Sequence, residues 1–241
     1  MEAMILAGGL GTRLASRLEG VPKAMAPIAG RPFLEILLLQ LHRAGCTRVI
    51  LSVGYLRQAI HDHFGAAFQG MRLDYSIENS PLGTGGAIRL ALAQAAEPSV
   101  LVLNGDTFLD ADYAAMLRFH AQENATATMA VVHRPDIARY GGVVIEQNHV
   151  VAYEEKRRAE SGQPRSGWIN AGAYVLSKDL EWPSGLGEKF SIEKDFFVLE
   201  AARLRPAAYE VNGYFLDIGI PEDFDRAQSE LAALAPWSPG S

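Results

Sequence analysis

Residues 4–23 read MILAGGLGTRLASRLEGVPK, an apolar run that leads directly into a glycine-rich loop followed by spaced cations. Gly8, Gly9 and Gly11 permit backbone conformations that are closed to residues with a β-carbon, so the N–H groups of this loop can turn inward around a phosphate. Arg13 and Lys23 add full positive charge. The stretch therefore predicts a strand followed by a loop that binds a triphosphate.

Two other glycine loops and an ordinary turn compete with this interpretation. A dinucleotide-binding G-x-G-x-x-G needs Gly or Ala at its sixth position, but counting from Gly9 and Gly11 leads to Leu14. The P-loop pattern G-x-x-x-x-G-K, counted from Gly8, puts Arg13 where the second glycine belongs. Both patterns fit poorly, and an ordinary tight strand-to-helix turn stays as the structural alternative.

Length and composition bound the architecture. A chain of 241 residues with 49% apolar and 21% charged residues is typical of one globular domain with a substantial core. We expect a single domain over 1–234 and a short flexible tail at 235–241. Cys46 is the only cysteine, which excludes an internal disulfide and a cysteine zinc site and fits a reducing compartment.

Charge and hydropathy limit the classes of molecule that we expect this protein to bind. No apolar run approaches the roughly 18 residues of a membrane span, and the N-terminus lacks a basic region before its apolar stretch, so we expect a cytoplasmic protein with no membrane partner. The formal net charge of −6 gives no support to a nucleic-acid partner. Any phosphate must then be held locally, by Arg13, Lys23 and Lys156, with a divalent metal supplying the remaining positive charge.

The order of predicted elements indicates an α/β fold, because β-rich runs alternate with helical stretches through the first half of the chain. The segment 33–45 is apolar nearly all round and predicts a buried helix that ends at Gly45. After residue 125, β-branched and aromatic residues predict strands that extend the sheet, and the polar stretch 157–167 predicts a mobile loop. We expect strands at 2–7, 48–53, 72–78 and 99–104, and helices at 33–44, 55–64, 84–95, 111–123, 192–203 and 221–234.

Two acidic residues follow predicted strands. Asp106 comes after the apolar run that ends at Asn104, where open α/β sheets bind ligands, and a carboxylate there can hold magnesium. Asp217 follows a second aromatic and apolar run, and two carboxylates suit an ion that completes its shell with phosphates and water. The structural alternative for each is turn chemistry before a helix, for which Asp110 and Asp112 on one side, and Glu222 and Asp223 on the other, are better placed.

These motifs resemble those of the sugar-1-phosphate nucleotidyltransferases, also called nucleoside-diphosphate-sugar pyrophosphorylases. The family's G-G-x-G-T-R-L signature, followed after a gap by P-K, matches Gly8 to Lys23, and its D-I-G-x-P-x-D motif matches Asp217 to Asp223. The resemblance runs from Met4 to about Leu231. It implies a Rossmann-like three-layer sandwich with a mostly parallel mixed sheet, the GT-A-like fold of nucleotide-diphospho-sugar transferases.

The resemblance also implies roles for individual residues. The family's E-K pair, in which Glu accepts sugar hydroxyls and Lys holds the phosphate, matches Glu155 and Lys156, although Arg157 stands where the family usually has Pro. For the glycines on the sugar side, a plain bulge or turn is the alternative to substrate contact. The implied roles are catalytic for Arg13, Lys23 and Lys156; Mg²⁺-binding for Asp106 and Asp217; sugar-phosphate-binding for Gly105, Gly141, Glu155, Lys156, Asn170 and Gly172; and nucleotide-binding for Leu6, Ala7, Gly8, Gly9, Gly11, Thr12, Arg13, Lys23, Glu78, Pro81, Gly83 and Thr84.

The loop 78–88, ENSPLGTGGAI, indicates which nucleobase the protein binds, because its P-L-G-T-G-G form looks like that of the guanylyltransferases. The carboxylate of Glu78 can accept the adjacent N1–H and N2–H donors of guanine. The run FSIEKDFF at 190–197 and the ending of the chain look most like enzymes that act on D-glycero-D-manno-heptose 1-phosphate, with mannose 1-phosphate as the alternative. Ser191, Glu193 and Asp195 either face the sugar or form the N-cap and first turn of a helix.

The implied reaction joins GTP, or another NTP, to a sugar 1-phosphate. The sugar-phosphate oxygen attacks the α-phosphorus in line and pyrophosphate leaves, so no base is required, and catalysis consists of positioning and charge neutralisation. A non-catalytic subunit that binds nucleotide or nucleotide-sugar is the alternative of another class. Homo-oligomer formation is left open.

Overall fold

The computed structural model describes residues 1–9, 14, 18, 20–154 and 164–234. Several predictions from the sequence fall elsewhere in the chain. The glycine-loop residues Gly11, Thr12 and Arg13, the pair Glu155 and Lys156, most of the loop at 157–167 and the tail at 235–241 lie outside the described residues.

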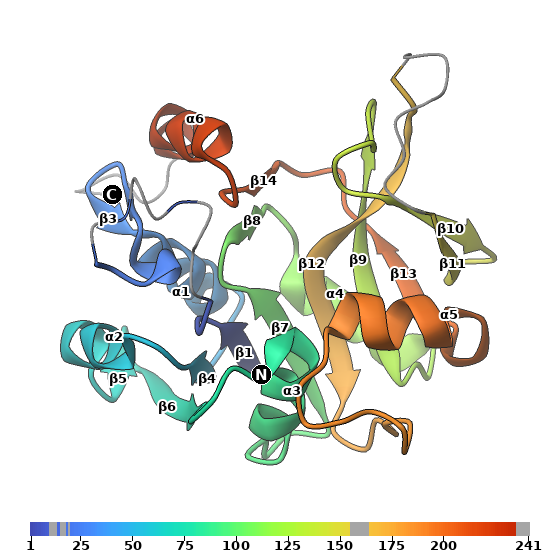
Figure 1. Cartoon of the computed structure of the whole chain (residues 1–241), viewed down its shortest axis with the longest axis horizontal. Helices are drawn as coiled ribbons and strands as arrows, with labels where there is room; N and C mark the ends of the chain where they lie inside the picture. The colour runs from blue at the N-terminus through green and yellow to red at the C-terminus, as the bar shows by residue number, and fades with distance from the viewer. Residues whose placement is uncertain (10–13, 15–17, 19, 155–163, 235–241) are drawn as a thin grey trace.

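A ten-stranded mixed sheet forms the centre of the molecule (Figure 1), in the order β10-β11-β13-β9-β12-β7-β1-β4-β6-β5. The pairs β7–β1, β1–β4, β4–β6 and β13–β9 are parallel, and the other neighbours are antiparallel. The expected mixed α/β sheet is therefore confirmed, but in the part of the chain that the structure describes its five antiparallel neighbouring pairs outnumber the four parallel ones, so the sheet is not mostly parallel. Its strands are β1 (Glu2–Leu6), β4 (Arg48–Val53), β5 (Ala67–Phe68), β6 (Met71–Ile77), β7 (Ser99–Asn104), β9 (Ala127–Arg134), β10 (Gly142–Glu146), β11 (His149–Glu154), β12 (Gly167–Ser177) and β13 (Ala207–Glu210).

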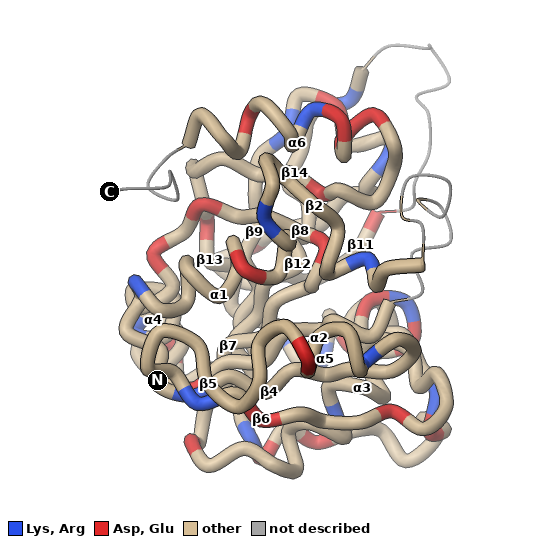
Figure 2. The backbone as a smooth tube through the Cα atoms, turned by 90° about the vertical axis from the view of Figure 1, so that its left-hand side faces the viewer, with Lys and Arg blue, Asp and Glu red and all other residues tan. Residues whose placement is uncertain are grey.

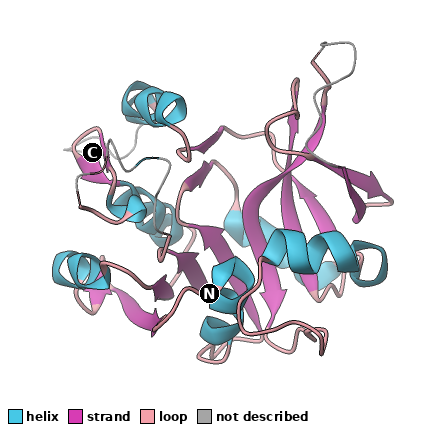
Figure 3. Ribbon diagram, viewed as in Figure 1, coloured by secondary structure: helices cyan, strands magenta, loops and turns pink. Residues whose placement is uncertain are grey.

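Helices cover both faces of the sheet and make three layers (Figure 3). Side chains of α1, α2, α4 and α6 join one hydrophobic cluster, and those of α3 and a π-helical turn at Ile192–Phe197 join a second cluster on the other face. The helices are α1 (Phe33–Arg43), α2 (Arg57–Phe64), α3 (Gly83–Leu92), α4 (Tyr113–Gln122), α5 (Val198–Leu204) and α6 (Pro221–Ala233).

The strand β1 shows why both faces of the sheet are covered by hydrophobic layers. Ala3 and Ile5 belong to the first cluster, whereas Met4 between them belongs to the second. Successive side chains of a strand point to opposite faces, so a continuous apolar run is stable only between two layers. Burying each such aliphatic side chain contributes about 1.5–3 kcal/mol.

The helix α1 is buried nearly all round, as predicted, and the chain turns beyond it at Gly45, whose φ is +82°. Gln40 on α1 donates from Nε2 to the carbonyl of Leu109 at 2.9 Å. That bond ties α1 to β8 (Thr107–Leu109), the short strand directly after Asp106. The first layer thus supports the backbone beside a predicted metal ligand.

Two helices begin later or split where the sequence predicts continuous ones. The helix α2 begins at Arg57 because Leu56 adopts the left-handed conformation, with φ 59°. The predicted helix at 192–203 consists of the π-helical turn followed by α5. Ser191 Oγ accepts from Lys194 N at 3.2 Å, and Asp195 Oδ2 accepts from Ser191 N at 2.7 Å. Ser191 and Asp195 therefore cap this turn, which is their structural alternative.

On the side of the molecule that faces the viewer in Figure 2, charged residues of both signs are interspersed over the described helices and loops. None of the helices in the described ranges is both long enough and apolar enough to cross a membrane.

Candidate active site

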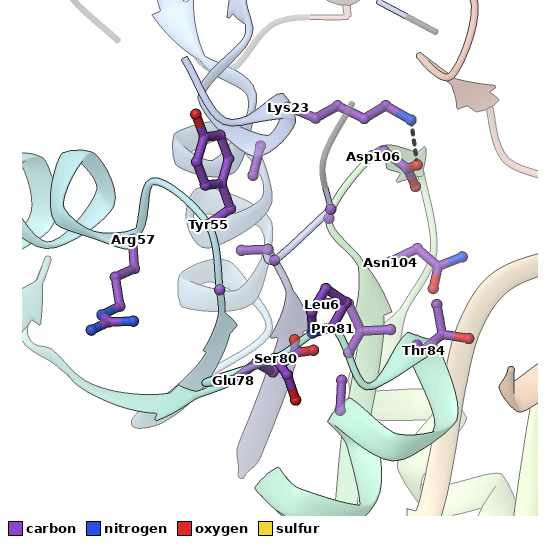
Figure 4. A pocket seen from close by; sticks show the side chains of 18 of the residues that line it. Leu6, Lys23, Tyr55, Arg57, Glu78, Ser80, Pro81, Thr84, Asn104 and Asp106 are labelled. Atoms are coloured by element: carbon purple, nitrogen blue, oxygen red, sulfur yellow. Dashed lines mark hydrogen bonds and ion pairs between the residues drawn. The ribbon is translucent and has the colours of Figure 1, made fainter. Parts of the chain in front are cut away.

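A cavity of about 670 Å³ opens at the carboxyl ends of β1, β4 and β7 (Figure 4). It contains eleven of the residues predicted to bind substrate or metal, from four separate stretches of the chain. Ligands in open α/β sheets bind at this edge, where the strand order reverses direction. The predicted residues that line the cavity are Leu6, Ala7, Gly8, Gly9, Lys23, Glu78, Pro81, Gly83, Thr84, Gly105 and Asp106.

Two glycines allow the floor of the cavity to close. A β-carbon on Gly105 would lie 2.3 Å from the carbonyl oxygen of Leu6, and one on Gly8 would lie 2.8 Å from Oε1 of Glu78. Nothing lies within 4 Å of the corresponding position on Gly9. Gly105 is thus required where β1 and β7 converge, because the backbone of Leu6 leaves no room for a side chain, whereas at Gly8 the nearest atom is the end of the Glu78 side chain and Gly9 borders open space.

Lys23 and Asp106 form an ion pair across the cavity, with 2.5 Å between Nζ and Oδ2 (Figure 4). Lys23 lies on a single 3₁₀ turn, and its side chain is 11% exposed, against 35% for Asp106. The ammonium group is therefore largely withdrawn from water, which strengthens its interaction with anions.

Asp217 reaches Asp106 through the pairing of two short strands. The strand β14 (Phe215–Asp217) lies antiparallel to β8, with Asp217 opposite Thr107, and Ile218 N donates to the carbonyl of Asp106 at 2.9 Å. Burial raises the pKa of Asp217, and the negative charge of Asp106 raises it further, against the lowering effects of Lys23 and of the Gly219 N–H. The two carboxylates thus meet in a partly desolvated place that favours a bound cation.

The carboxylate pair is a set of hard oxygen donors. Within the part of the chain that the structure describes, no three or more His, Cys, Asp or Glu side chains gather in a way that could hold a metal ion. Mg²⁺ keeps several waters and substrate phosphates among its ligands, so one or two carboxylates are enough for it. Asp106 and Asp217 therefore fit Mg²⁺ better than a metal that needs a full protein shell.

Two of the neighbouring acids, Asp112 and Asp223, make structural contacts. Asp112 Oδ1 accepts from Ala115 N at 2.8 Å and caps α4. Asp223 is buried and pairs with Arg139 and with Arg226, the latter at 2.9 Å.

The loop 78–88, referred to below as the base loop, is held in place by the side chain of Glu78, the residue predicted to read the base. Glu78 Oε2 accepts from Leu82 N at 3.0 Å, and its Oε1 accepts from Ser52 Oγ at 3.2 Å. Gly83 has φ +69°, and a β-carbon there would lie 2.6 Å from the carbonyl oxygen of Phe190. Thr84 Oγ1 accepts from Ile192 N at 3.0 Å. The loop is thus shaped by its own contacts before any ligand is considered.

Of the predicted sugar-side residues that the structure describes, Gly105 lines the cavity, whereas Gly141, Asn170 and Gly172 do not. Gly172 has φ +70° and packs against Asn104, a cavity residue, with only 2.6 Å between a hypothetical β-carbon and Nδ2. Asn170 Oδ1 accepts from Gly172 N at 2.9 Å. Gly141, with φ +80°, precedes β10 and donates to the carbonyl of Ile137 at 2.9 Å. Both positive φ values favour glycine independently of any substrate.

Several cavity residues were missed by sequence reasoning. Gly54 and Tyr55 directly follow β4, and Tyr55 is 67% exposed at the cavity. Asn104 ends β7. Their positions at the carboxyl ends of parallel strands were a usable signal. The missed residues are Ala24, Gly54, Tyr55, Arg57, Asn79, Ser80, Ala87 and Asn104.

The raised pKa of Asp217 has a consequence for stability. Folding raises this pKa above the ordinary aspartate value of 3.8, so the folded protein holds the proton to higher pH than the unfolded chain does. The contribution of Asp217 to stability therefore falls as the pH rises from 3.8 through the raised pKa. We expect Asp217→Asn to have a higher Tm than the parent at pH 7, with the difference vanishing at pH 3.5 or below.

Thermal unfolding over this pH range checks the expectation, with Glu222→Gln, an exposed acid in the first turn of α6, as the control. An Asp217→Asn variant that is less stable than the parent at pH 7 would contradict it.

Comparisons with known proteins show which family the chain belongs to. A family model described as nucleotidyl transferase matches residues 2–233. The D-glycero-alpha-D-manno-heptose 1-phosphate guanylyltransferase of Aneurinibacillus thermoaerophilus is 41% identical over 231 residues, which cover 96% of this chain and 98% of that protein. The protein of the same name from Campylobacter jejuni subsp. jejuni serotype O:2 is 41% identical over 225 residues, covering 93% and 97%.

A solved structure shows the same fold. HddC from Yersinia pseudotuberculosis, complexed with GMP-PN, superimposes with a TM-score of 0.81 at 37% identity, covering 95% of this chain and 99% of that one. The family match spans the motifs at both ends of the chain and confirms the resemblance that they indicated. The chain belongs to the nucleotidyl transferase family.

Proposed function

We propose that the chain transfers the guanylyl group of GTP to D-glycero-α-D-manno-heptose 1-phosphate and releases pyrophosphate. The observation that carries the proposal is the cavity that gathers Lys23, Asp106 and the base loop at one edge of the sheet, with Asp217 beside them. Two relatives at 41% identity bear the name of this activity, and HddC was solved with GMP-PN, which supports a guanine nucleotide.

The reaction needs no catalytic base. The phosphate oxygen of the sugar 1-phosphate is already anionic, so it attacks the α-phosphorus directly while the bond from that phosphorus to the bridging oxygen breaks and pyrophosphate leaves with the electron pair. The chain contributes positioning and positive charge, which we assign to Lys23 in the cavity and to Arg13 and Lys156. Lys23 can exchange its carboxylate partner Asp106 for a phosphate oxygen.

Asp106 and Asp217 would hold Mg²⁺, which supplies positive charge for the phosphates. On the sugar side we assign the hydroxyl contacts to Glu155 and Asn170, with Gly141 and Gly172 giving close approach of the backbone. The cytoplasmic location expected from the sequence and assembly into a homo-oligomer stay predictions.

Glu78 is proposed to select guanine. Exchanging its carboxylate for an amide removes one acceptor, so Glu78→Gln is expected to lower the preference for GTP over UTP by about 10- to 100-fold, the range of a lost bidentate contact. Steady-state kcat/KM with both nucleotides measures the ratio. Glu123→Gln, at the C-terminal end of α4 and not among the residues that line the cavity, is the control.

An unchanged ratio in Glu78→Gln would show that the carboxylate only shapes the loop through Ser52 and Leu82. The base preference would then come from other groups.

Pyrophosphate release by the purified protein tests the function itself. The assay contains Mg²⁺ and crosses GTP, UTP, dTTP, CTP and ATP with heptose, mannose and glucose 1-phosphates. A dominant signal with GTP and the heptose supports the proposal, and GTP with mannose 1-phosphate would replace the sugar. Silence throughout, from folded protein that binds nucleotide, would favour the non-catalytic alternative.

A further inference from the structure

Asn170 lies in a hydrogen-bond network that extends beyond the predicted sugar side. Its Nδ2 donates to the hydroxyl of Tyr174 at 2.7 Å and to Oε1 of Glu193 at 3.1 Å. Its Oδ1 accepts from the backbone N–H of Gly172 at 2.9 Å. Strand β12 carries Asn170, Gly172 and Tyr174, and the π-helical turn carries Glu193.

These contacts determine which way the amide of Asn170 is turned. An ionised carboxylate only accepts, so the side of the amide facing Glu193 must be the NH₂ group, and a backbone N–H only donates, so the side facing Gly172 must be the oxygen. The two hydrogens on Nδ2 are then both used, by Tyr174 and Glu193. Among the described residues, Gly172 N is the one donor to Oδ1, so its second lone pair is available for a substrate.

Burial strengthens this network. Tyr174 is fully buried, and burial together with the negative charge of Glu193 holds the pKa of its hydroxyl well above the ordinary tyrosine value. The hydroxyl therefore keeps its proton. In a poorly solvated setting a misdirected amide would leave a polar group without a partner, which is costlier than at a surface.

The turn that carries Glu193 is anchored to the nucleotide side. Ile192 N donates to Thr84 Oγ1, and Phe190 is joined to the base loop through its N–H to the carbonyl of Leu82 at 2.9 Å. Thr84 lies at the cavity beside Asn104, against which Gly172 packs (Figure 4). Single π-helical turns are frequent at functional sites.

We propose that Glu193 is a positioning residue for sugar recognition: it turns the amide of Asn170 so that the oxygen, as an acceptor, meets a hydroxyl of the sugar 1-phosphate. This inference rests on the proposed function. The inference specifies how Asn170 would contact the sugar: its side chain accepts a hydrogen bond from a sugar hydroxyl and donates none to the sugar.

Exchanging the amide of Asn170 and the carboxylate of Glu193 between the two positions tests the proposal. Asn170→Asp keeps the acceptor but sets two carboxylates against each other, so the KM for the sugar 1-phosphate should rise about 30-fold with the KM for GTP within about 2-fold. Glu193→Gln alone should raise the sugar KM about 5-fold, because its amide no longer dictates the orientation of Asn170. The double variant restores one donor and one acceptor, and its sugar KM should return to within about 5-fold of the parent.

The matched control is Asp195→Asn. It removes a carboxylate from the same turn, one that accepts from Ser191 N and does not contact Asn170 in the described residues. Its sugar KM should match that of the parent. A double variant no better than Asn170→Asp, or equal rises in the KM for GTP and sugar, would overturn the proposal.

A separate measurement distinguishes failure of the proposed function from failure of the positioning role of Glu193. If the parent turns over no sugar 1-phosphate, the function fails, and the same four proteins are compared by thermal unfolding without substrate. Non-additive changes in Tm, with the double variant more stable than Asn170→Asp, support positioning of Asn170 by Glu193, whereas additive changes overturn it.

Discussion

Asp106→Asn is expected to lower kcat at least about 1000-fold, equivalent to roughly 4 kcal/mol of lost transition-state stabilisation. The carboxylate of Asp106 is 35% exposed and forms an ion pair with Lys23 at 2.5 Å. An amide of the same shape keeps the packing but removes the charge that attracts a divalent cation. The loss should therefore fall on catalysis, while the Tm changes by only a few degrees.

Two measurements separate charge from folding. Pyrophosphate release gives kcat, and electron paramagnetic resonance of Mn²⁺ in the presence of GTP reports metal retention, which we expect to weaken in Asp106→Asn. Asp110→Asn, four residues further along the same segment, is the control and should retain both properties. Near-normal turnover by Asp106→Asn would remove Asp106 from the metal site.

Gly105→Ala is expected to cost about 3 kcal/mol of folding stability, because the site has no room for a methyl group. The added β-carbon would lie 2.3 Å from the carbonyl oxygen of Leu6 and 3.0 Å from its carbonyl carbon. Both atoms belong to β1, which is hydrogen-bonded on both sides in the sheet, so neither can move alone. For a domain of this size the Tm should fall by roughly 6–12 °C.

Gly185→Ala is the matched control, since nothing lies within 4 Å of its hypothetical β-carbon and its φ is not positive. Calorimetry of the two variants gives the comparison. A Gly105→Ala protein with the Tm of the parent would mean that β7 and β1 separate easily at this edge. The floor of the cavity would then be softer than its contacts indicate.

Much of the first half of the fold is encoded locally. The strand before the glycine loop, the buried helix α1 and the acidic residue after β7 each follow from a short pattern of apolar, glycine and acidic residues, and the structure has all three. Such patterns are readable because strand and helix periodicities act over a few residues. Helix boundaries were less predictable, since the left-handed Leu56 has no side-chain signature.

The partners of the site residues depend on contacts between distant parts of the chain. Thr84 was predicted to bind nucleotide from its motif, but its hydroxyl accepts from Ile192, 108 residues away. Glu193 offered two interpretations in the sequence; the structure places it in the first turn of the π-helical segment, where its Oε1 accepts from Asn170 Nδ2. Neither bond can be inferred from local periodicity, because each joins the π-helical turn to a distant element, α3 in one case and β12 in the other.

By itself, the sequence determined the family, the α/β class and the residue types able to hold phosphate and metal, because these depend on local composition and spacing. The tertiary structure alone decided that Lys23 pairs with Asp106, 83 residues away, and that the β8–β14 pairing sets Asp217 beside them. Strand pairing and burial depend on how the whole chain packs, and burial also raises the pKa of Asp217. The chemistry of the site therefore comes from residues that the sequence names and the fold brings together.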